Sequence, residues 1–406
     1  MSTPLRLRGH RPRRGARPPE PQIVRTVALD RLSRPPADRR RTGLAVLHLL
    51  RCARQDRQAT DLEAGWVLAQ DPALLGRLLA AHRVGPLVHD VLASTPSLSG
   101  LTALTAPLHA AQLRRTLAAR PDLDLLCRRL QGLRWTVVKG AAAASLYSRP
   151  TTREWHDVDV LVHGEDLPRA LEALETGGAA VITPDWRRTA DLALGEVGLA
   201  LPHGTVLDLH WHLLNLAERR HAFRYDVRTV LHRRRTRRVL GLDVPVPHPV
   251  DEAHHLAVHA TLSGGWRLGW SYDVAQAADR LEDWDGLVAL TREAGTGLVV
   301  GLALQRAREL LGARVPTDVL RDLHRRGRGW SRVGRVVTAW VPPQALEGPD
   351  WLSTRCYAGA RGTSAHSLRR FLVRARAAVE TTPPAVPDLR ARQDWFALAA
   401  AETQAP

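Results

Sequence analysis

Two aspartates separated by a single valine, Asp157 and Asp159, are the residues whose type and spacing most directly suggest chemistry. They lie in the segment Asp-Val-Asp-Val-Leu-Val, an alternation typical of a half-buried β-strand, so both carboxylates should project from the same face. Carboxylates this close repel each other unless a proton or a cation offsets their charge, and paired oxygen ligands suit Mg²⁺. The spacing therefore predicts a site for one or two Mg²⁺ ions, with Mn²⁺ as the alternative metal. A solvent-exposed strand edge is the structural alternative.

A Lys-Gly turn precedes this predicted strand. Val137 and Val138 end a short apolar segment that breaks at Gly140, and the small residues from Ala141 onward open a predicted helix. A glycine at this position lets backbone N–H groups approach a phosphate at a helix N-terminus. Lys139 is the only lysine in a chain whose other basic residues are all arginine. This bias is explained either by genome composition or by a need for a compact, flexible ammonium at this point.

A third aspartate lies about 50 residues further along the chain. Residues 199–211 are predicted to form a hairpin, in whose second arm Asp208 and His210 share one face. An unpaired charge in such an apolar setting would be costly, so Asp208 needs a metal, a proton or another partner. A purely structural hydrogen bond is the alternative interpretation.

Helical periodicity surrounds this strand-rich section on both sides. The predicted helices cover residues 43–56, 62–95, 104–131, 250–262, 271–281, 284–295, 298–312 and 316–327, with weaker patterns at 330–341 and 366–380. The predicted division of the chain is a disordered tail (1–42), a helical region (43–133), an α/β core (134–247), a second helical domain (248–380) and a loose C-terminal tail (381–406), for which a short terminal helix is the alternative.

The net charge of +17 is concentrated rather than uniform. Residues 1–42 hold 12 arginines and only three acidic residues, so this proline-rich segment carries more than half of the excess. A second arginine run at 233–238 is interpreted as solvated surface. Nucleic-acid binding is therefore possible but not favoured, and the basic tail is also a possible contact for a protein partner.

The remaining composition excludes several classes of protein. Cys52, Cys127 and Cys356 show no metal-binding or disulfide spacing. No apolar run reaches the length of a membrane span, and the arginine-rich N-terminus lacks the apolar region of a secretory signal. We therefore expect a cytoplasmic protein without a membrane segment.

Taken together, these segments resemble the uncharacterised bacterial nucleotidyltransferase family, whose members have the polymerase β-type nucleotidyltransferase superfold. In that family a Lys-Gly-Ala turn, an arginine four residues before an Asp-hydrophobic-Asp pair, an Asp-hydrophobic-His-Trp strand and a Trp-x-x-Asp helix recur. The resemblance extends over roughly residues 45–290. The matching segments are VVKGAAAASLYSRPTTREWHDVDVLV, DLHWHL, HPVDEAHHLAVHA and WRLGWSYDVAQ.

The resemblance implies an α+β fold, with a small mixed β-sheet nucleotidyltransferase core flanked by N-terminal and C-terminal helical parts. It also implies Mg²⁺-dependent transfer of a nucleoside monophosphate from a nucleoside triphosphate (NTP) such as ATP to an unidentified hydroxyl acceptor, with specialised metabolism as one setting. Asp157, Asp159 and Asp208 would hold the metal, and Asp208 would also help to deprotonate the acceptor. The phosphates would lie against the nucleotide-binding residues Lys139, Gly140, Ala141 and Arg153.

Two other interpretations stay open. Histidines at metal-binding spacing on one predicted helix, His255 and His259, would form a metallohydrolase site together with Asp208. They would instead face the nucleotide pocket, like His210 and Asp273, if the transferase interpretation holds. The second alternative is a binding or regulatory protein that keeps the nucleotidyltransferase fold without turnover.

Overall fold

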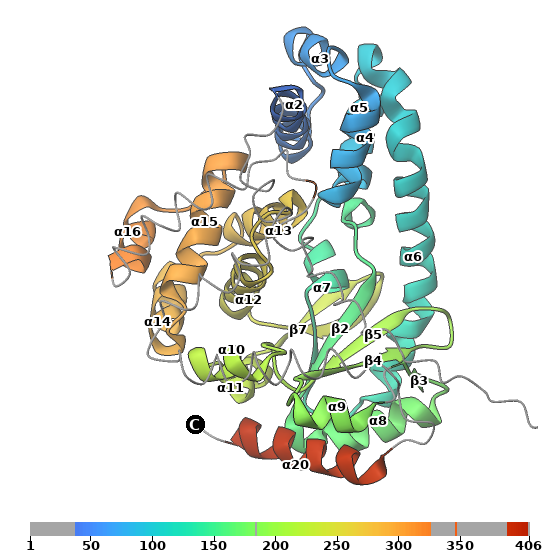
Figure 1. The fold of residues 1–406 in the computed structure, drawn as a ribbon, viewed down its shortest axis with the longest axis vertical. Coiled ribbons are helices and arrows are strands. Elements are labelled where there is room, and N and C mark those ends of the chain that lie inside the picture. Colours follow the sequence, from blue (N-terminus) through green and yellow to red (C-terminus); the bar gives the residue numbers. More distant parts are fainter. Residues whose placement is uncertain (1–36, 183–184, 326–345, 347–387, 405–406) are drawn as a thin grey trace, which may run out of the picture. The chain divides into compact units, whose positions relative to one another are not determined.

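The computed structural model describes residues 37–182, 185–325, 346 and 388–404, and Figure 1 gives the element labels. Most of the predicted N-terminal tail and the weakly predicted helices at 330–341 and 366–380 lie outside the described residues. The described chain is an α+β structure, in which helices flank a five-stranded mixed sheet and a separate two-stranded sheet (Figure 1). This confirms the predicted fold class. Among the described residues, no helix is both long and apolar enough to cross a membrane.

The main sheet aligns the predicted site residues. Strands β2 and β5 are parallel neighbours, and Asp159 is opposite Asp208 in their register, whereas the other neighbouring strands are antiparallel. The antiparallel pairing of β4 with β5 confirms the predicted hairpin and places Glu196 opposite His210. In spatial order the strands are β1 (Trp135–Val138), β2 (Asp157–Val162), β5 (Val206–His210), β4 (Glu196–Ala200) and β3 (Ala180–Val181).

Alternation along the two central strands gives the sheet one apolar face and one functional face. On one face of β2 and β5, the apolar side chains of Val158, Val160 and Leu209 are fully buried. They share a hydrophobic core with side chains from α6 (Thr102–Arg129), α8 (Leu167–Thr176) and α20 (Leu389–Gln404), so this face is closed to solvent. The aspartates point the other way, as the two-residue period of a strand requires.

Helices before the sheet match the predicted periodicity. They are α2 (Ala37–Arg54), α3 (Asp61–Leu68), α4 (Pro72–Ala81), α5 (Gly85–Ser94) and α6 (Thr102–Arg129). Helix α6 continues through both Pro107 and Pro121 without a break. Helix α2 begins at Ala37, inside the segment that we predicted to be disordered. In this part of the helix Thr42 is buried, and its hydroxyl donates to the carbonyl of Asp38 at 2.8 Å.

The predicted helices after the sheet are also confirmed. They are α12 (Pro249–Leu262), α13 (Leu268–Ala278), α14 (Trp284–Ala294), α15 (Gly297–Leu311) and α16 (Thr317–Arg325). Helices α12, α13 and α15 pack against one another, and the first two contribute residues to the pocket described below.

The sequence patterns did not predict the hairpin that contains the arginine run. Strands β6 (Arg235–Val239) and β7 (Leu242–Val246) are joined at Leu240 and Gly241, both with positive φ, as a tight hairpin turn requires. Several of its arginines are bound to side chains of the same chain: the ion pairs are Arg233–Asp251, Arg237–Glu252 and Arg238–Asp243. Much of this charge is therefore already balanced.

The C-terminal segment contains the terminal helix that was the alternative to a loose tail. Residues Leu389–Gln404 form helix α20, whose Trp395 is fully buried and donates its indole N–H to the carbonyl of Leu194 at 2.6 Å. A Cβ atom at Gly164 would come within 2.1 Å of the carbonyl oxygen of Ala399, so only glycine allows this close approach. Large apolar residues are few in this helix, which explains why periodicity predicted it only as an alternative. The remaining short helices are α7 (Gly140–Ala144), α8 (Leu167–Thr176), α9 (Trp186–Asp191), α10 (Ala217–Ala222) and α11 (Val227–His232).

Candidate active site

The Lys-Gly turn at the end of β1 is strained and tightly packed. Lys139 has φ 47° and ψ −138°, and Gly140 has φ 24°. A Cβ atom at Gly140 would lie 2.8 Å from the carbonyl oxygen of Asp157, so glycine is needed here for close packing against β2. A non-glycine residue with positive φ costs stability and is often retained at functional sites. The following residue, Ala141, is buried inside the short helix α7.

A row of alternating charges crosses the functional face of the sheet. The carboxylate of Asp159 interacts with two cationic side chains: Lys139 Nζ lies 2.6 Å and His210 Nε2 lies 3.0 Å from its Oδ1 atom. The other ring nitrogen of His210, Nδ1, lies 3.0 Å from Oε2 of Glu196. The side chains of Asp159 and His210 are only 6% and 3% exposed, so these charges depend on one another.

This row sets the protonation of its members. Burial alone would raise the pKa of Asp159, but Lys139 and His210 outweigh burial and hold it well below its usual range. Burial would lower the pKa of His210, but the neighbouring carboxylates, Glu196 first, raise it to about 9. At neutral pH the row therefore contains an ionised Asp159 and a protonated His210.

Asp157 and Asp208 behave differently, because neither carboxylate forms an ion pair with the part of the chain that the structure describes. Burial, and then the charge of Asp159, raise the pKa of Asp208 to about 6 and also raise the pKa of Asp157. One carboxylate in the site is thus permanently ionised, whereas its neighbour titrates near physiological pH. Divergent pKa values of this kind are common among catalytic carboxylates.

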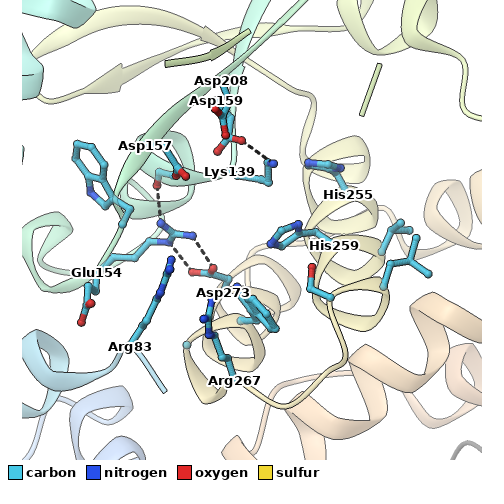
Figure 2. A pocket seen from close by; sticks show the side chains of 18 of the residues that line it. Arg83, Lys139, Glu154, Asp157, Asp159, Asp208, His255, His259, Arg267 and Asp273 are labelled. Carbon is cyan, nitrogen blue, oxygen red and sulfur yellow. Dashed lines mark hydrogen bonds and ion pairs between the residues drawn. The ribbon is translucent and has the colours of Figure 1, made fainter. Parts of the chain in front are cut away.

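The donor chemistry fits a divalent cation. Ligand atoms from Asp159, Asp208 and His210 all lie within 4.8 Å of one another. The two carboxylates supply the hard oxygen ligands that Mg²⁺ prefers, whereas a protonated His210 has no free lone pair. Asp157 lies outside this group of three but lines the same pocket, and Figure 2 shows its carboxylate on the side where Asp159 and Asp208 lie. Its assignment as a metal ligand remains a prediction.

Binding of Mn²⁺ is expected to strengthen about tenfold between roughly pH 5 and pH 7. The reason is that Asp208, whose pKa burial raises to about 6, must lose its proton before it can bind a cation. Titration calorimetry with Mn²⁺ at the two pH values would measure this change. The pH dependence should largely disappear in Asp208→Asn, and an unchanged dependence in that variant would contradict the assignment.

Arg153, which we predicted to balance phosphate charge, is bound to a carboxylate. Its Nε and Nη2 atoms donate to the two carboxylate oxygens of Asp273, both at 2.7 Å, and Nη1 donates to the carbonyl of Gly140 at 3.0 Å. Tyr147 adds a hydroxyl donor to the same carboxylate at 2.7 Å. This cluster joins the loop before β2 to helix α13, so its clearest role is structural.

Two histidines of α12, His255 and His259, line the pocket, and among the described residues they do not form a metal cluster. His255 is 3% exposed, and neither of its ring nitrogens has a hydrogen-bond partner among the described residues. Burial lowers the pKa of His259 to about 3, and burial also keeps the pKa of His255 well below its usual value, so both rings are neutral. In the part of the chain that the structure describes, neither belongs to a group of three possible metal ligands. Nothing in this arrangement supports a metallohydrolase site.

These groups converge on one pocket of about 330 Å³. The sheet provides its carboxylates, the turn between α4 and α5 provides Arg83, and α12 and α13 close the remaining sides. Several lining residues were not identified from the sequence. Glu196 could have been identified by extending the predicted hairpin back to it. Arg83 lies in no recognisable motif, and Arg267 lies in the segment WRLGWSYDVAQ without a pattern that marks it as a site residue. Of the site residues predicted from the sequence, all line this pocket except Ala141.

The mixed sheet places carboxylates on neighbouring parallel strands, beside a glycine turn that follows the first strand, and this order matches the nucleotidyltransferase core that the sequence resemblance implied. The family model described as uncharacterised nucleotidyltransferase matches residues 69–312, which is more than half of the chain. The chain therefore belongs to this family. The match includes every residue that lines the pocket. No curated protein matches the chain.

Proposed function

We propose that this protein is a metal-dependent nucleotidyltransferase that moves a nucleoside monophosphate from an NTP to a hydroxyl acceptor. The observation that carries the proposal is the pair Asp159 and Asp208, opposite each other on parallel strands at the base of the pocket. Membership of the nucleotidyltransferase family supports it. Magnesium is the proposed cation, because carboxylate oxygens are its preferred ligands.

The carboxylates of Asp159 and Asp208, with Asp157 as a further candidate, would hold the cation. When bound, the cation would neutralise charge on the phosphate oxygens. Lys139 and His210 keep Asp159 ionised, so this ligand stays available at any physiological pH. Asp208, with its raised pKa of about 6, is suited to accept the proton of the acceptor hydroxyl.

Incubation with each labelled NTP, Mg²⁺ and a cell extract, followed by mass spectrometry, should reveal a nucleotidylated product and release of pyrophosphate. Asp208→Asn serves as the matched inactive protein in the same extract. Products that are equally abundant with this variant would count against the proposal. Titration with an NTP and Mg²⁺ also tests the alternative of a binding protein without turnover, which predicts binding without pyrophosphate release.

A further inference from the structure

Two lysine or arginine side chains of the pocket are already paired with carboxylates. Lys139 is bound to Asp159, and Arg153 is bound to Asp273. A third cation, Arg219, donates to the carbonyl of Leu262 at 2.9 Å. The side chains that we predicted to contact phosphate are therefore engaged within the protein, and the charge of an anionic substrate must be balanced elsewhere.

Arg83 and Arg267 lie on the opposite wall from the sheet carboxylates (Figure 2). They belong to segments far apart in sequence that His82 holds together: its carbonyl accepts from the N–H of Gly269 at 3.1 Å, and its Nδ1 accepts from the N–H of Leu268 at 3.3 Å. A Cβ atom at Gly269 would lie 3.0 Å from the same carbonyl oxygen. The two arginines are thus held in place by hydrogen bonds between their segments.

Arg267 is oriented by aromatic rings and keeps an unused donor. Its guanidinium lies 5.0 Å from the ring centroid of Trp266 and 4.8 Å from that of Trp270. Its Nε atom is buried and has no hydrogen-bond partner among the described residues. Burial and the nearby charge of Arg83 lower the pKa of Arg267 to about 10, so it remains a cation at neutral pH. A buried donor without a partner is uncommon and calls for an explanation.

Arg83 lines the same pocket, and its charge lowers the pKa of Asp157 without forming an ion pair with that carboxylate. The backbone of Arg83 has φ 54°. No ion pair connects the Arg83 side chain to the part of the chain that the structure describes. The charge of Glu154 acts on Arg267 and raises its pKa, but among the described residues no carboxylate forms an ion pair with the Arg267 guanidinium. Two neighbouring arginines without a bound carboxylate repel each other, and an anion between them would relieve this repulsion.

We propose that Arg83 and Arg267 form an anion subsite that binds the distal phosphates of the donor NTP. This inference rests on the proposed function. A nucleotide whose reacting phosphate lies at Asp159 and Asp208 has its remaining phosphates repelled by that carboxylate cluster, and the two arginines offer the unpaired positive charge on the facing wall. Guanidinium groups also match the geometry of phosphate oxygens through parallel N–H donors.

Calorimetry would test the subsite with four probes: a non-hydrolysable NTP analogue with Mg²⁺, the corresponding nucleoside monophosphate, inorganic triphosphate, and inorganic sulfate as a charge control. We expect Arg83→Gln and Arg267→Gln each to weaken binding of the NTP analogue and of triphosphate at least about tenfold. Binding of the monophosphate should change less than about twofold. Arg238→Gln, on the exposed hairpin, is the control for loss of one arginine charge.

The two substitutions also separate a binding effect from a folding effect. Arg267 packs against Trp266 and Trp270, so thermal unfolding of Arg267→Gln shows whether this variant has lost stability. Arg83 stacks on no aromatic ring among the described residues, so Arg83→Gln tests the charge without that packing loss. Unchanged affinity for the NTP analogue in both variants would overturn the subsite, and so would equal weakening of monophosphate and NTP. If the NTP affinity is unchanged but the acceptor KM rises, the arginines bind an acidic acceptor instead. If the wild-type protein binds no nucleotide at all, the proposed function fails together with the subsite.

Discussion

Replacing Asp208 by asparagine should lower the rate of nucleotidyl transfer by at least about two orders of magnitude while leaving the protein as stable as the wild type or slightly more stable. The substitution preserves the shape of the side chain but removes a metal-binding oxygen and the proposed proton acceptor. Stability is kept because the ionised carboxylate of Asp208 is disfavoured in the folded state, as its raised pKa of about 6 shows.

The sign of this effect can be checked against pH. Because the folded-state pKa of Asp208 exceeds its unfolded value, its favourable contribution is complete below the unfolded pKa and is lost as pH rises through about 6. The stability advantage of Asp208→Asn should therefore be present at pH 7 and should vanish near pH 4. Pyrophosphate release and urea unfolding would measure the two effects.

Asp243→Asn, at an exposed position of the β6–β7 hairpin, provides the matched control. It removes one carboxylate far from the proposed chemistry and should leave the transfer rate unchanged. Retention of transfer within about tenfold of the wild-type rate in Asp208→Asn would refute the assignment of Asp208.

Removal of Asp273 is expected to cost about 3–5 kcal/mol of unfolding free energy. The substitution Asp273→Ala leaves the guanidinium of Arg153, whose side chain is only 11% exposed, without its carboxylate. It also removes the acceptor for the Tyr147 hydroxyl. Denaturant unfolding followed by circular dichroism would measure the loss.

A double substitution distinguishes the loss of a pair from the loss of packing. Arg153→Met combined with Asp273→Leu should recover much of the stability, because no unpaired buried charge remains. Disruption of the exposed pair Arg238–Asp243 by Asp243→Ala should cost no more than about 1 kcal/mol. A loss of similar size for Asp273→Ala and Asp243→Ala would show that the buried cluster contributes little.

The strand and helix elements around the site were largely predictable because each depends on local periodicity. Alternation located β2 and the arm that contains Asp208, and the parallel pairing of these strands then brought the aspartates together. Helices α12 and α13 followed from their apolar spacing. The single tight turn at Gly140 was also predictable, although the observed reason is its close packing against Asp157.

The partners of the charged residues were not predictable in the same way. Whether Arg153 contacts phosphate or a carboxylate depends on Asp273, which lies on a helix that only the tertiary fold brings near. The same applies to Arg83 and Arg267, which come together through hydrogen bonds to His82. Helix α20 was predicted only as an alternative because its few apolar side chains give a weak pattern, although Trp395 is fully buried.

The position of α20 has a consequence for the order of folding. Its Trp395 belongs to the same apolar core as Val160 of β2 and Leu209 of β5, although the helix lies far along the chain from these strands. During synthesis on the ribosome, part of the apolar face of the sheet therefore stays uncovered until α20 has been synthesised. Contacts between segments so distant in sequence slow folding and leave the intermediate exposed to aggregation. We expect the nascent chain to rely on chaperones during this interval.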